Sequence, residues 1–413
     1  MSDYGGSIGP LVNFEAPWLA WHSALPRGGC RKVRVASPCV GVDSPCRAAM
    51  ALKFPWVSVL IYDIEAELVP ALDRMHGPVG TPWIRAGPRK GDVTQLTEKL
   101  LLDHLAQHGF RVCDGLVSGF PCPPYSSIGS RKLGDDPRAA VCTAVVNMIK
   151  WLAKRSFLQW FVLENVVGIK KRARGQVESF ADWLMSFIMA ELEREGLKGW
   201  RCAMRPHSAA DTSLVQHRDR VFFVGTSSHM RETTVQRALV SMPLPVRPRV
   251  NLLSILEHRS SEIDFANLTF QQQLNVMTQM KRFDEMEAAD PNFAHEMGVV
   301  DASRNADKEH CVDGDIKLDK VSTFRTNNKF LWLIPHRLLR HTFGPYGRLM
   351  SREEKCAASG LLASSLTGLS DHRLEVAIGN TIPPPLIGDI LAPLLASWTL
   401  HMRDMQDRSF IHT

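Results

Sequence analysis

The chain has 413 residues, a mass of 46.2 kDa and a formal net charge of +6, with 45% hydrophobic and 22% charged residues. This length excludes a peptide hormone or a single small module, and the composition is that of a globular protein able to bury a large core. The mild excess of bases permits a polyanionic partner without requiring one.

The spacing of the cysteines indicates whether the protein binds metal, and the length of its apolar stretches indicates whether it is secreted or crosses a membrane. None of the nine cysteines forms a C-x-x-C pair, so we expect neither a zinc ribbon nor a dense disulfide framework, and no metal. No stretch reaches 18 apolar residues, and residues 1–9 lack the basic start and apolar run of a signal peptide. We therefore expect a soluble intracellular protein without a membrane partner, nuclear in a eukaryote or cytoplasmic in a prokaryote.

Strand-like and helix-like segments alternate after an irregular, Gly- and Pro-containing extension at residues 1–30. The expected strands are 33–37, 57–62, 112–118, 160–164, 200–204 and 220–225. The expected helices are 44–54, 65–76, 95–108, 137–156 and 177–195. This alternation predicts an α/β fold with a doubly wound, mostly parallel sheet.

The alternation stops near residue 230, where three prolines between 243 and 248 predict a stiff linker. Residues 281–320 carry six basic and eleven acidic residues, whereas residues 321–348 carry five basic and no acidic ones. Two adjacent blocks of opposite charge indicate a second, smaller domain at 231–347. From Arg348 the pattern is again helical, and it ends in an apolar stretch at 385–400.

The first chemical motif is Pro121-Cys122, which follows an expected strand that ends at Gly119. In open parallel sheets the reactive positions lie just beyond the carboxyl ends of the strands. Three prolines within four residues favour a rigid turn that presents the thiol, although a buried structural cysteine is the alternative.

The second motif is Glu164-Asn165, which ends the next expected strand 42 residues after Cys122. One helix lies between them, so a right-handed crossover brings both strand ends to the same edge of the sheet. A thiol and a carboxylic acid at one edge can serve as nucleophile and proton donor. The alternative is that Glu164 merely caps a helix.

Two further motifs lie towards the C-terminus. Alternation places Gln216, Arg218 and Arg220 on one face of an extended segment, which suits an anionic or carbonyl-rich ligand, although a solvated strand is the alternative. Gly379-Asn380 and the prolines after it predict a tight turn and a helix start.

In content and order these motifs resemble those of the cytosine-5 DNA methyltransferases. The matching segments are Pro121-Cys122 with Ser126 and Gly129, Glu164-Asn165-Val166, Gln216-x-Arg218-x-Arg220, an arginine-glutamate motif at 348–353, and Gly379-Asn380. The resemblance covers roughly residues 31–230 and 345–400.

The resemblance implies a class I, Rossmann-like enzyme that depends on S-adenosylmethionine, with a smaller inserted target-recognition domain. The implied plan is an extension at 1–30, a catalytic and cofactor-binding domain at 31–230, a target-recognition domain at 231–347, and a part at 348–413 that completes the catalytic domain. We expect a monomer that acts on double-stranded DNA.

The resemblance also implies catalytic roles. Cys122 would attack C6 of a flipped-out cytosine, so that C5 can accept the methyl group. Glu164 would hydrogen-bond N3 and the exocyclic amine, and Arg220 together with Arg218 would hold O2. In the first cofactor turn Gly41 is retained, but Asp43 stands where the family has its second glycine, and the family's phenylalanine is missing. The other cofactor-binding residues expected are Asp63 and Glu65 for the ribose, Asp92 for the adenine, Pro121 and Asn380.

Substrate contacts are expected from several segments. A loop at 125–138 is expected to close over the flipped nucleotide and to reach phosphates. In the basic stretch at 321–348, polar side chains lie among the basic ones and could hydrogen-bond the edges of DNA bases. The alternative is that the basic residues pair with the acidic block at 281–320. The expected substrate-binding residues are Ser126, Arg131, Lys132, Gln216, Arg325 and Lys329.

Two other functions stay open. A transfer RNA cytosine-5 methyltransferase would use the same fold, but that branch carries a Cys-Phe-Thr tripeptide that this chain lacks. A catalytically silent DNA-binding homologue is favoured by the altered cofactor turn and opposed by Cys122, Glu164 and Arg220.

Overall fold

The computed structural model describes residues 31–39, 41–65, 68–76, 91–121, 139–155, 157–172, 177–212, 214–230, 251–256, 265–290, 293, 295–302, 316–321, 324 and 331–411. These residues form two compact units, described separately below. The larger unit comprises residues 31–208, 219–230 and 381–411, and the smaller unit comprises residues 209–218 and 251–380.

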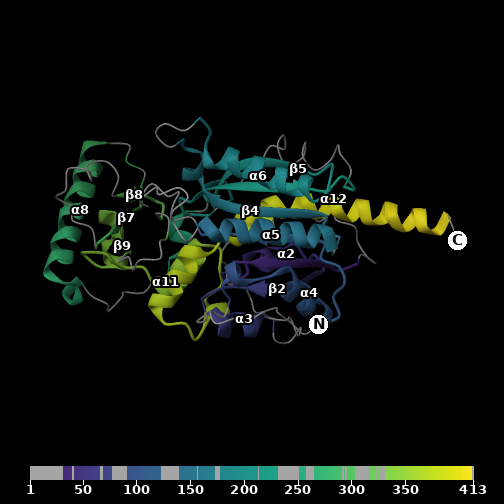
Figure 1. Ribbon diagram of the computed structural model, residues 1–413. Coiled ribbons are helices and arrows are strands. Elements are labelled where there is room, and N and C mark those ends of the chain that lie inside the picture. The colour runs from purple at the N-terminus through teal and green to yellow at the C-terminus, as the bar shows by residue number, and fades with distance from the viewer. Residues whose placement is uncertain are drawn as a thin grey trace. The chain divides into compact units, whose positions relative to one another are not determined.

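A six-stranded sheet forms the centre of the larger unit (Figure 1). Its strands are β1 (Val33–Pro38), β2 (Trp56–Tyr62), β3 (Gly115–Ser118), β4 (Trp160–Val166), β5 (Arg201–Ser208) and β6 (Asp219–Thr226). Their order is β2-β1-β3-β4-β6-β5. Only β6 runs antiparallel to its neighbours, so the other five strands point the same way. The doubly wound, mostly parallel sheet is therefore confirmed.

Helices cover both faces of this sheet, because its central strands are apolar on both sides. In β4, Phe161 and Leu163 pack in one core with α4 (Glu98–Gln107), α5 (Ala139–Arg155) and α6 (Phe180–Arg194). Trp160 and Val162 face the opposite core, with α2 (Ser44–Ala51) and α12 (Pro384–Ile411). Helix α3 (Val69–His76) also belongs to this unit. None of the helices in the described parts of the chain combines the length and apolarity needed to cross a membrane.

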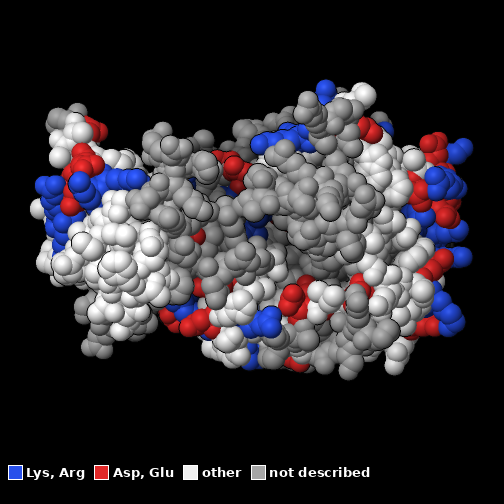
Figure 2. All heavy atoms as spheres, turned by 60° about the vertical axis from the view of Figure 1, so that its left-hand side comes forward, with Lys and Arg blue, Asp and Glu red and all other residues white. Residues whose placement is uncertain are grey.

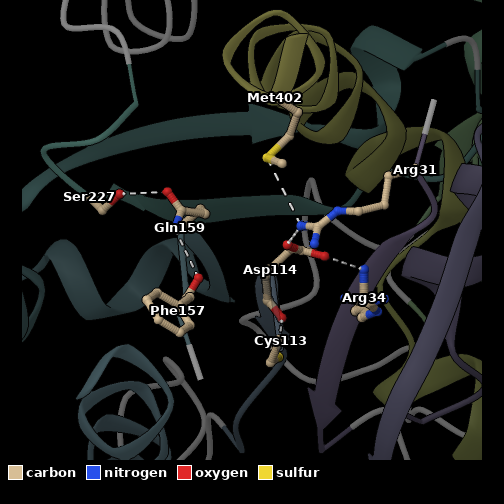
Figure 3. A network of polar contacts seen from close by, with 9 residues as sticks. Arg31, Arg34, Cys113, Asp114, Phe157, Gln159, Ser227 and Met402 are labelled. Carbon is tan, nitrogen blue, oxygen red and sulfur yellow. Dashed lines mark hydrogen bonds and ion pairs between the residues drawn. The ribbon is translucent and has the colours of Figure 1, made fainter. Parts of the chain in front are cut away.

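A polar network fixes the amino ends of the parallel strands, at the edge opposite Glu164 (Figure 3). The Asp114 carboxylate accepts a hydrogen bond from the Arg34 backbone N–H at 2.9 Å and pairs with the Arg31 guanidinium. The Asp114 carbonyl accepts from the Gln159 N–H at 2.9 Å. Burial raises the pKa of Asp114, and Arg31 opposes that shift. Strand β3 begins at Gly115, three residues later than predicted.

The smaller unit is built on a four-stranded antiparallel sheet of order β10-β9-β7-β8. Its strands are β7 (Met297–Asp301), β8 (Lys317–Leu318), β9 (Leu331–Pro335) and β10 (Arg348–Leu349). Its helices are α8 (Phe270–Ala289), α9 (Arg340–Phe343), α10 (Arg352–Ala358) and α11 (Asp371–Asn380). Val276 and Phe283 of α8 pack against Trp332 and Ile334 of β9.

Short 3-10 helices complete the described chain. They are η3 (Val93–Gln95), η4 (Val167–Lys170), η5 (Ala209–Thr212), η6 (Leu252–Ile255), η7 (Phe265–Asn267), η9 (Arg337–Leu339) and η10 (Ala363–Leu366). The compact smaller unit reaches residue 380, whereas the predicted target-recognition domain ends at 347. Compact packing and functional role need not share a boundary, so the functional domain limits remain a prediction.

The acidic and basic blocks of the sequence meet within the smaller unit. Arg340 pairs with Asp284 of α8, and Arg337 lies 3.7 Å from a Glu287 oxygen. On the face seen in Figure 2, basic and acidic side chains lie next to each other. Internal pairing, the alternative stated for the basic stretch, therefore holds for these two arginines.

Arg348 is also paired internally: its guanidinium donates to the Glu354 carboxylate, at 2.8 Å for one of the two bonds, and both side chains are buried. This pair fastens the end of the basic stretch to the start of α10. Arg325 and Lys329 lie outside the described residues, so their contact with DNA remains a prediction.

Candidate active site

The carboxyl ends of β3 and β4 lie together at one edge of the sheet. The two strands pair in parallel, with Ser118 opposite Leu163. A Cβ placed on Gly119 would lie only 3.2 Å from Oε2 of Glu164. The sequence prediction that these two strand ends share one edge is confirmed. Cys122 itself lies outside the described residues, which reach Pro121, a partly exposed residue.

Glu164 is buried against an arginine. Its Oε1 lies 2.6 Å from Nε of Arg220, and the two residues are 7% and 8% exposed. Arg220 projects from β6, where its backbone pairs with Val166, and its Nη1 donates to the Asp219 carbonyl at 2.7 Å. Glu164 therefore lies inside β4 and caps no helix. The pair holds a carboxylate and a guanidinium in fixed positions beside the end of β3.

Asn165 is a residue that the sequence analysis did not assign to the site. It is almost fully buried, its Nδ2 donates to the Phe120 carbonyl at 3.3 Å, and its Oδ1 accepts from the Val166 N–H at 2.8 Å. Asn165 thus ties the end of β4 to the backbone that leads into Pro121. Its place in the Glu-Asn-Val motif was a signal, but the sequence could not show its partner.

Gln216, Arg218 and Arg220 are buried, while the intervening His217 and Asp219 are exposed. The predicted alternation, with these three side chains on one face, is therefore confirmed. The alternative that this face is exposed to solvent is wrong.

The three residues of this motif do not fall in one unit. Arg220 belongs to the larger unit with Glu164, and the other two belong to the smaller unit. There, Arg218 Nη2 donates to the Gly379 carbonyl at 2.9 Å, next to Asn380 at the end of α11. The Gln216 side-chain amide has no hydrogen-bond partner among the described residues.

The first cofactor turn is fastened to the end of β2. The Gly41 N–H donates to Oδ2 of Asp63 at 2.8 Å, and Oδ1 of Asp63 accepts from the Glu65 N–H at 2.9 Å. Burial raises the pKa of Asp63 to about 6, although these two N–H groups lower it. Three residues predicted to hold the cofactor are thus brought together.

Asp92 reaches the same edge because a glycine precedes it. Gly91 has a φ of +86°, and a Cβ there would lie 1.8 Å from the Asp63 carbonyl oxygen. Only glycine allows this approach. Asp92 caps η3 by accepting from the Thr94 N–H at 3.0 Å, and Tyr62 donates its hydroxyl to the Asp92 carbonyl at 3.2 Å. The edge therefore offers two carboxylates beside one glycine turn.

Of the predicted substrate contacts, three more lie outside the described residues: Ser126, Arg131 and Lys132. The described chain also contains one buried group of side chains with metal-ligand chemistry, namely Asp43, Cys46 and His76, whose ligand atoms lie within 4.8 Å of one another. Within this group, Nε2 of His76 lies 2.8 Å from Oδ2 of Asp43.

Comparisons with known proteins agree with this geometry. The family model described as C-5 cytosine-specific DNA methylase matches residues 85–395. Type II methyltransferase M1.ScrFI of Lactococcus lactis subsp. cremoris is 30% identical over 168 residues, which are 40% of this chain and 36% of that protein. Type II methyltransferase M.NlaX of Neisseria lactamica is 30% identical over 139 residues, which are 34% of this chain and 37% of that protein.

The matched part thus spans little more than a third of these relatives. Solved structures support the fold. The S. pombe Dnmt2 methyltransferase has a TM-score of 0.57 at 14% identity and covers 88% of this chain and 98% of its own. The Entamoeba histolytica methyltransferase EhMeth has a TM-score of 0.54 at 13% identity, with the same coverage.

Proposed function

The chain belongs to the C-5 cytosine-specific DNA methylase family, and we propose that it transfers a methyl group from S-adenosylmethionine to C5 of cytosine in double-stranded DNA. The observation that carries this proposal is the buried Glu164–Arg220 pair, fixed at the point where β3 runs towards Pro121-Cys122. The curated relatives are named as Type II methyltransferases, which agrees with DNA as the substrate class.

The reaction needs a nucleophile and a proton donor because C5 of cytosine is unreactive within an intact aromatic ring. In the proposed mechanism the Cys122 thiolate adds to C6, and Glu164 hydrogen-bonds N3 and the exocyclic amine as charge develops there. Once C5 carries the methyl group, loss of the C5 proton and elimination of the Cys122 thiolate restore the ring. Among the described residues Arg220 contacts Glu164 through Nε and the Asp219 carbonyl through Nη1, and we assign its Nη2 to the cytosine O2. Such fixed donors stabilise the adduct without reorganising during the reaction.

The end of β3 must be held still for the thiol to reach C6. Asn165 does this in our proposal, because its amide binds the Phe120 carbonyl two residues before Cys122. The base must leave the helical stack for Cys122 and Glu164 to act on its opposite edges.

The glycine turn and the acids beside it fit S-adenosylmethionine. Asp63 and Glu65 offer acceptors for ribose hydroxyls, Asp92 offers an acceptor for the adenine amine, and Gly41 leaves room for close approach. We extend this assignment to Pro121 and Asn380. When bound, the cofactor supplies an electrophilic methyl group.

A nucleoside assay tests the function. Wild-type protein, S-adenosylmethionine and either unmethylated duplex DNA or transfer RNA are incubated, and the digested nucleosides are analysed by mass spectrometry. We expect 5-methyl-2′-deoxycytidine from DNA, and none when Glu164→Gln removes the proton donor. Methylation of transfer RNA alone would overturn the substrate, and cofactor binding without any methylation would indicate a silent homologue.

A further inference from the structure

Asp43 occupies a backbone conformation that suits glycine. It lies between β1 and α2 with φ 51° and ψ 55°, in the left-handed region, and it is the N-cap of α2. Aspartate and asparagine tolerate this region better than other residues with a Cβ. In the family that this chain resembles, a glycine stands here, next to the cofactor. The direction of the Asp43 carboxylate therefore decides whether the turn still admits that cofactor.

The Asp43 carboxylate points into the protein and not out of the turn. Asp43 is 0% exposed, and its Oδ1 accepts from the Cys46 N–H at 3.4 Å. Its Oδ2 accepts from the Ser58 hydroxyl of β2 at 3.3 Å and lies 2.8 Å from Nε2 of His76. Each carboxylate oxygen thus has a partner within the larger unit.

His76 contributes an imidazole whose Nε2 lies against the Asp43 carboxylate. It is the last residue of α3, and its side chain is 4% exposed. A buried carboxylate is costly unless a cation or several hydrogen bonds compensate it. Ser58 and the Cys46 N–H are neutral donors, and Cys46 is a thiol whose pKa burial and Asp43 raise, so the thiol stays uncharged. Among the contacts of Asp43 with described residues, His76 is the one whose side chain can take up a proton and become positively charged.

We propose that His76 is a positioning residue for the cofactor turn: its contact with Asp43 holds the carboxylate inward and thereby allows an aspartate to replace the glycine. This inference rests on the proposed binding of S-adenosylmethionine at Gly41 and Asp63. Without His76, the buried carboxylate would lose this contact and would turn towards water, into the space that the cofactor needs. The altered turn would then be a compensated substitution and not a sign of lost cofactor binding.

A double-mutant cycle tests the coupling by calorimetry on the full chain. The proteins are wild type, His76→Ala, Asp43→Gly and the double variant, each titrated with S-adenosylmethionine and with the product S-adenosylhomocysteine, which lacks the sulfonium charge. We expect His76→Ala to weaken both ligands about tenfold in the presence of Asp43, and by less than about threefold when Asp43→Gly has removed the carboxylate. Asp43→Gly alone should bind within about threefold of wild type, because glycine adopts the same φ without strain.

Two further variants test whether His76→Ala acts through a general loss of structure. His76→Gln keeps an N–H donor for Asp43, so it should retain more affinity than His76→Ala. His104→Ala removes another buried histidine of the larger unit, one whose pKa burial lowers to about 4, and should leave both affinities unchanged. Melting curves accompany each titration.

Several results would overturn the inference. Equal losses from His76→Ala with and without Asp43→Gly would show a general structural role. A change for S-adenosylmethionine alone would show that Asp43 acts on the sulfonium charge. One equivalent of metal in the wild-type protein, lost on Cys46→Ala, would make the group a metal site. If wild type binds neither ligand, the proposed function fails, and this inference falls with it.

Discussion

Replacing Gly119 by alanine would disturb the carboxylate at the reaction site with little disturbance of the fold. Gly119 directly follows β3 and lies against Glu164. The added Cβ would lie 3.2 Å from Oε2 of Glu164 and 3.4 Å from Cδ1 of Ile382. The distance to Glu164 is shorter than an ordinary contact, so the carboxylate must shift by a few tenths of an ångström, whereas the distance to Ile382 is close to an ordinary contact. The carboxylate cannot turn freely, because its other oxygen is held by Arg220.

The expected loss of activity follows from that displacement. A misplacement of about 1 Å can cost about a hundredfold in rate, so a few tenths of an ångström should lower kcat about three- to tenfold. Stability should change by less than about 1 kcal/mol, because alanine lowers the entropy of the unfolded chain by a similar amount. Gly115→Ala, on the same strand, is the matched control. Its Cβ would lie 2.2 Å from the Trp160 ring, so overpacking should cost about 1–3 kcal/mol of stability.

Methyl transfer to duplex DNA under steady-state conditions gives kcat for both variants, and urea denaturation gives the free energy of unfolding. If Gly119→Ala keeps the wild-type kcat, the Glu164 carboxylate does not act from the position seen here. If it loses about 3 kcal/mol of stability or more, the loss of activity would be a folding defect, and the reasoning from local geometry would be refuted.

Four further predictions concern cofactor binding, the stability of the free protein and DNA binding. Asp92→Ala should weaken S-adenosylmethionine binding by about 1–3 kcal/mol, because the adenine amine loses its acceptor; an unchanged dissociation constant by calorimetry would place the adenine elsewhere. Because the pKa of Asp63 is about 6, its carboxylate gains a proton as pH falls through 6, so cofactor affinity should drop by up to about tenfold per pH unit below 6 and stay level above it. The stability of the free protein should follow the opposite trend with pH. Because folding raises the pKa of Asp63, the free energy of unfolding should decline as pH rises from the ordinary aspartate value of 3.8 through 6. Replacing Arg325 and Lys329 by alanine should reduce the log–log salt slope of DNA binding by about one unit per lost phosphate contact, whereas Arg340→Ala should lower the melting temperature and leave the slope unchanged.

Much of the catalytic fold could be predicted because its strands are buried on both faces and read as continuous apolar runs. The sequence also predicted that the carboxyl end of β3 and Glu164 lie at the same edge of the sheet, because a β-α-β connection makes a right-handed crossover. The reversed direction of β6 was not predicted, since hydrophobic pattern alone does not give strand direction. In the structure the connection from β5 at Ser208 to β6 at Asp219 is too short for a parallel crossover, but the strand ends expected from the sequence, 204 and 220, left a longer gap and did not show this.

Pairings between distant residues could not be predicted. The sequence indicated that Asp43 was out of place in a glycine turn, but its partner His76 lies on another helix, beyond a strand. Likewise, the basic residue Arg340 suggested DNA contact until α8 brought Asp284 to it. Charge patterns show which residues need partners, and only the fold determines which partners they find.

The central claim is a covalent attack by Cys122 on cytosine, and trapping with 5-fluorocytosine tests it most directly. With S-adenosylmethionine and duplex DNA carrying 5-fluoro-2′-deoxycytidine, the fluorine blocks loss of the C5 substituent, so the adduct cannot resolve. We predict a stable complex whose peptide mass places the nucleotide on Cys122. Cys122→Ser should give no covalent complex, because serine is a far weaker nucleophile, and this variant should still bind DNA. Equal trapping of both proteins, or an adduct on a different cysteine, would contradict the account.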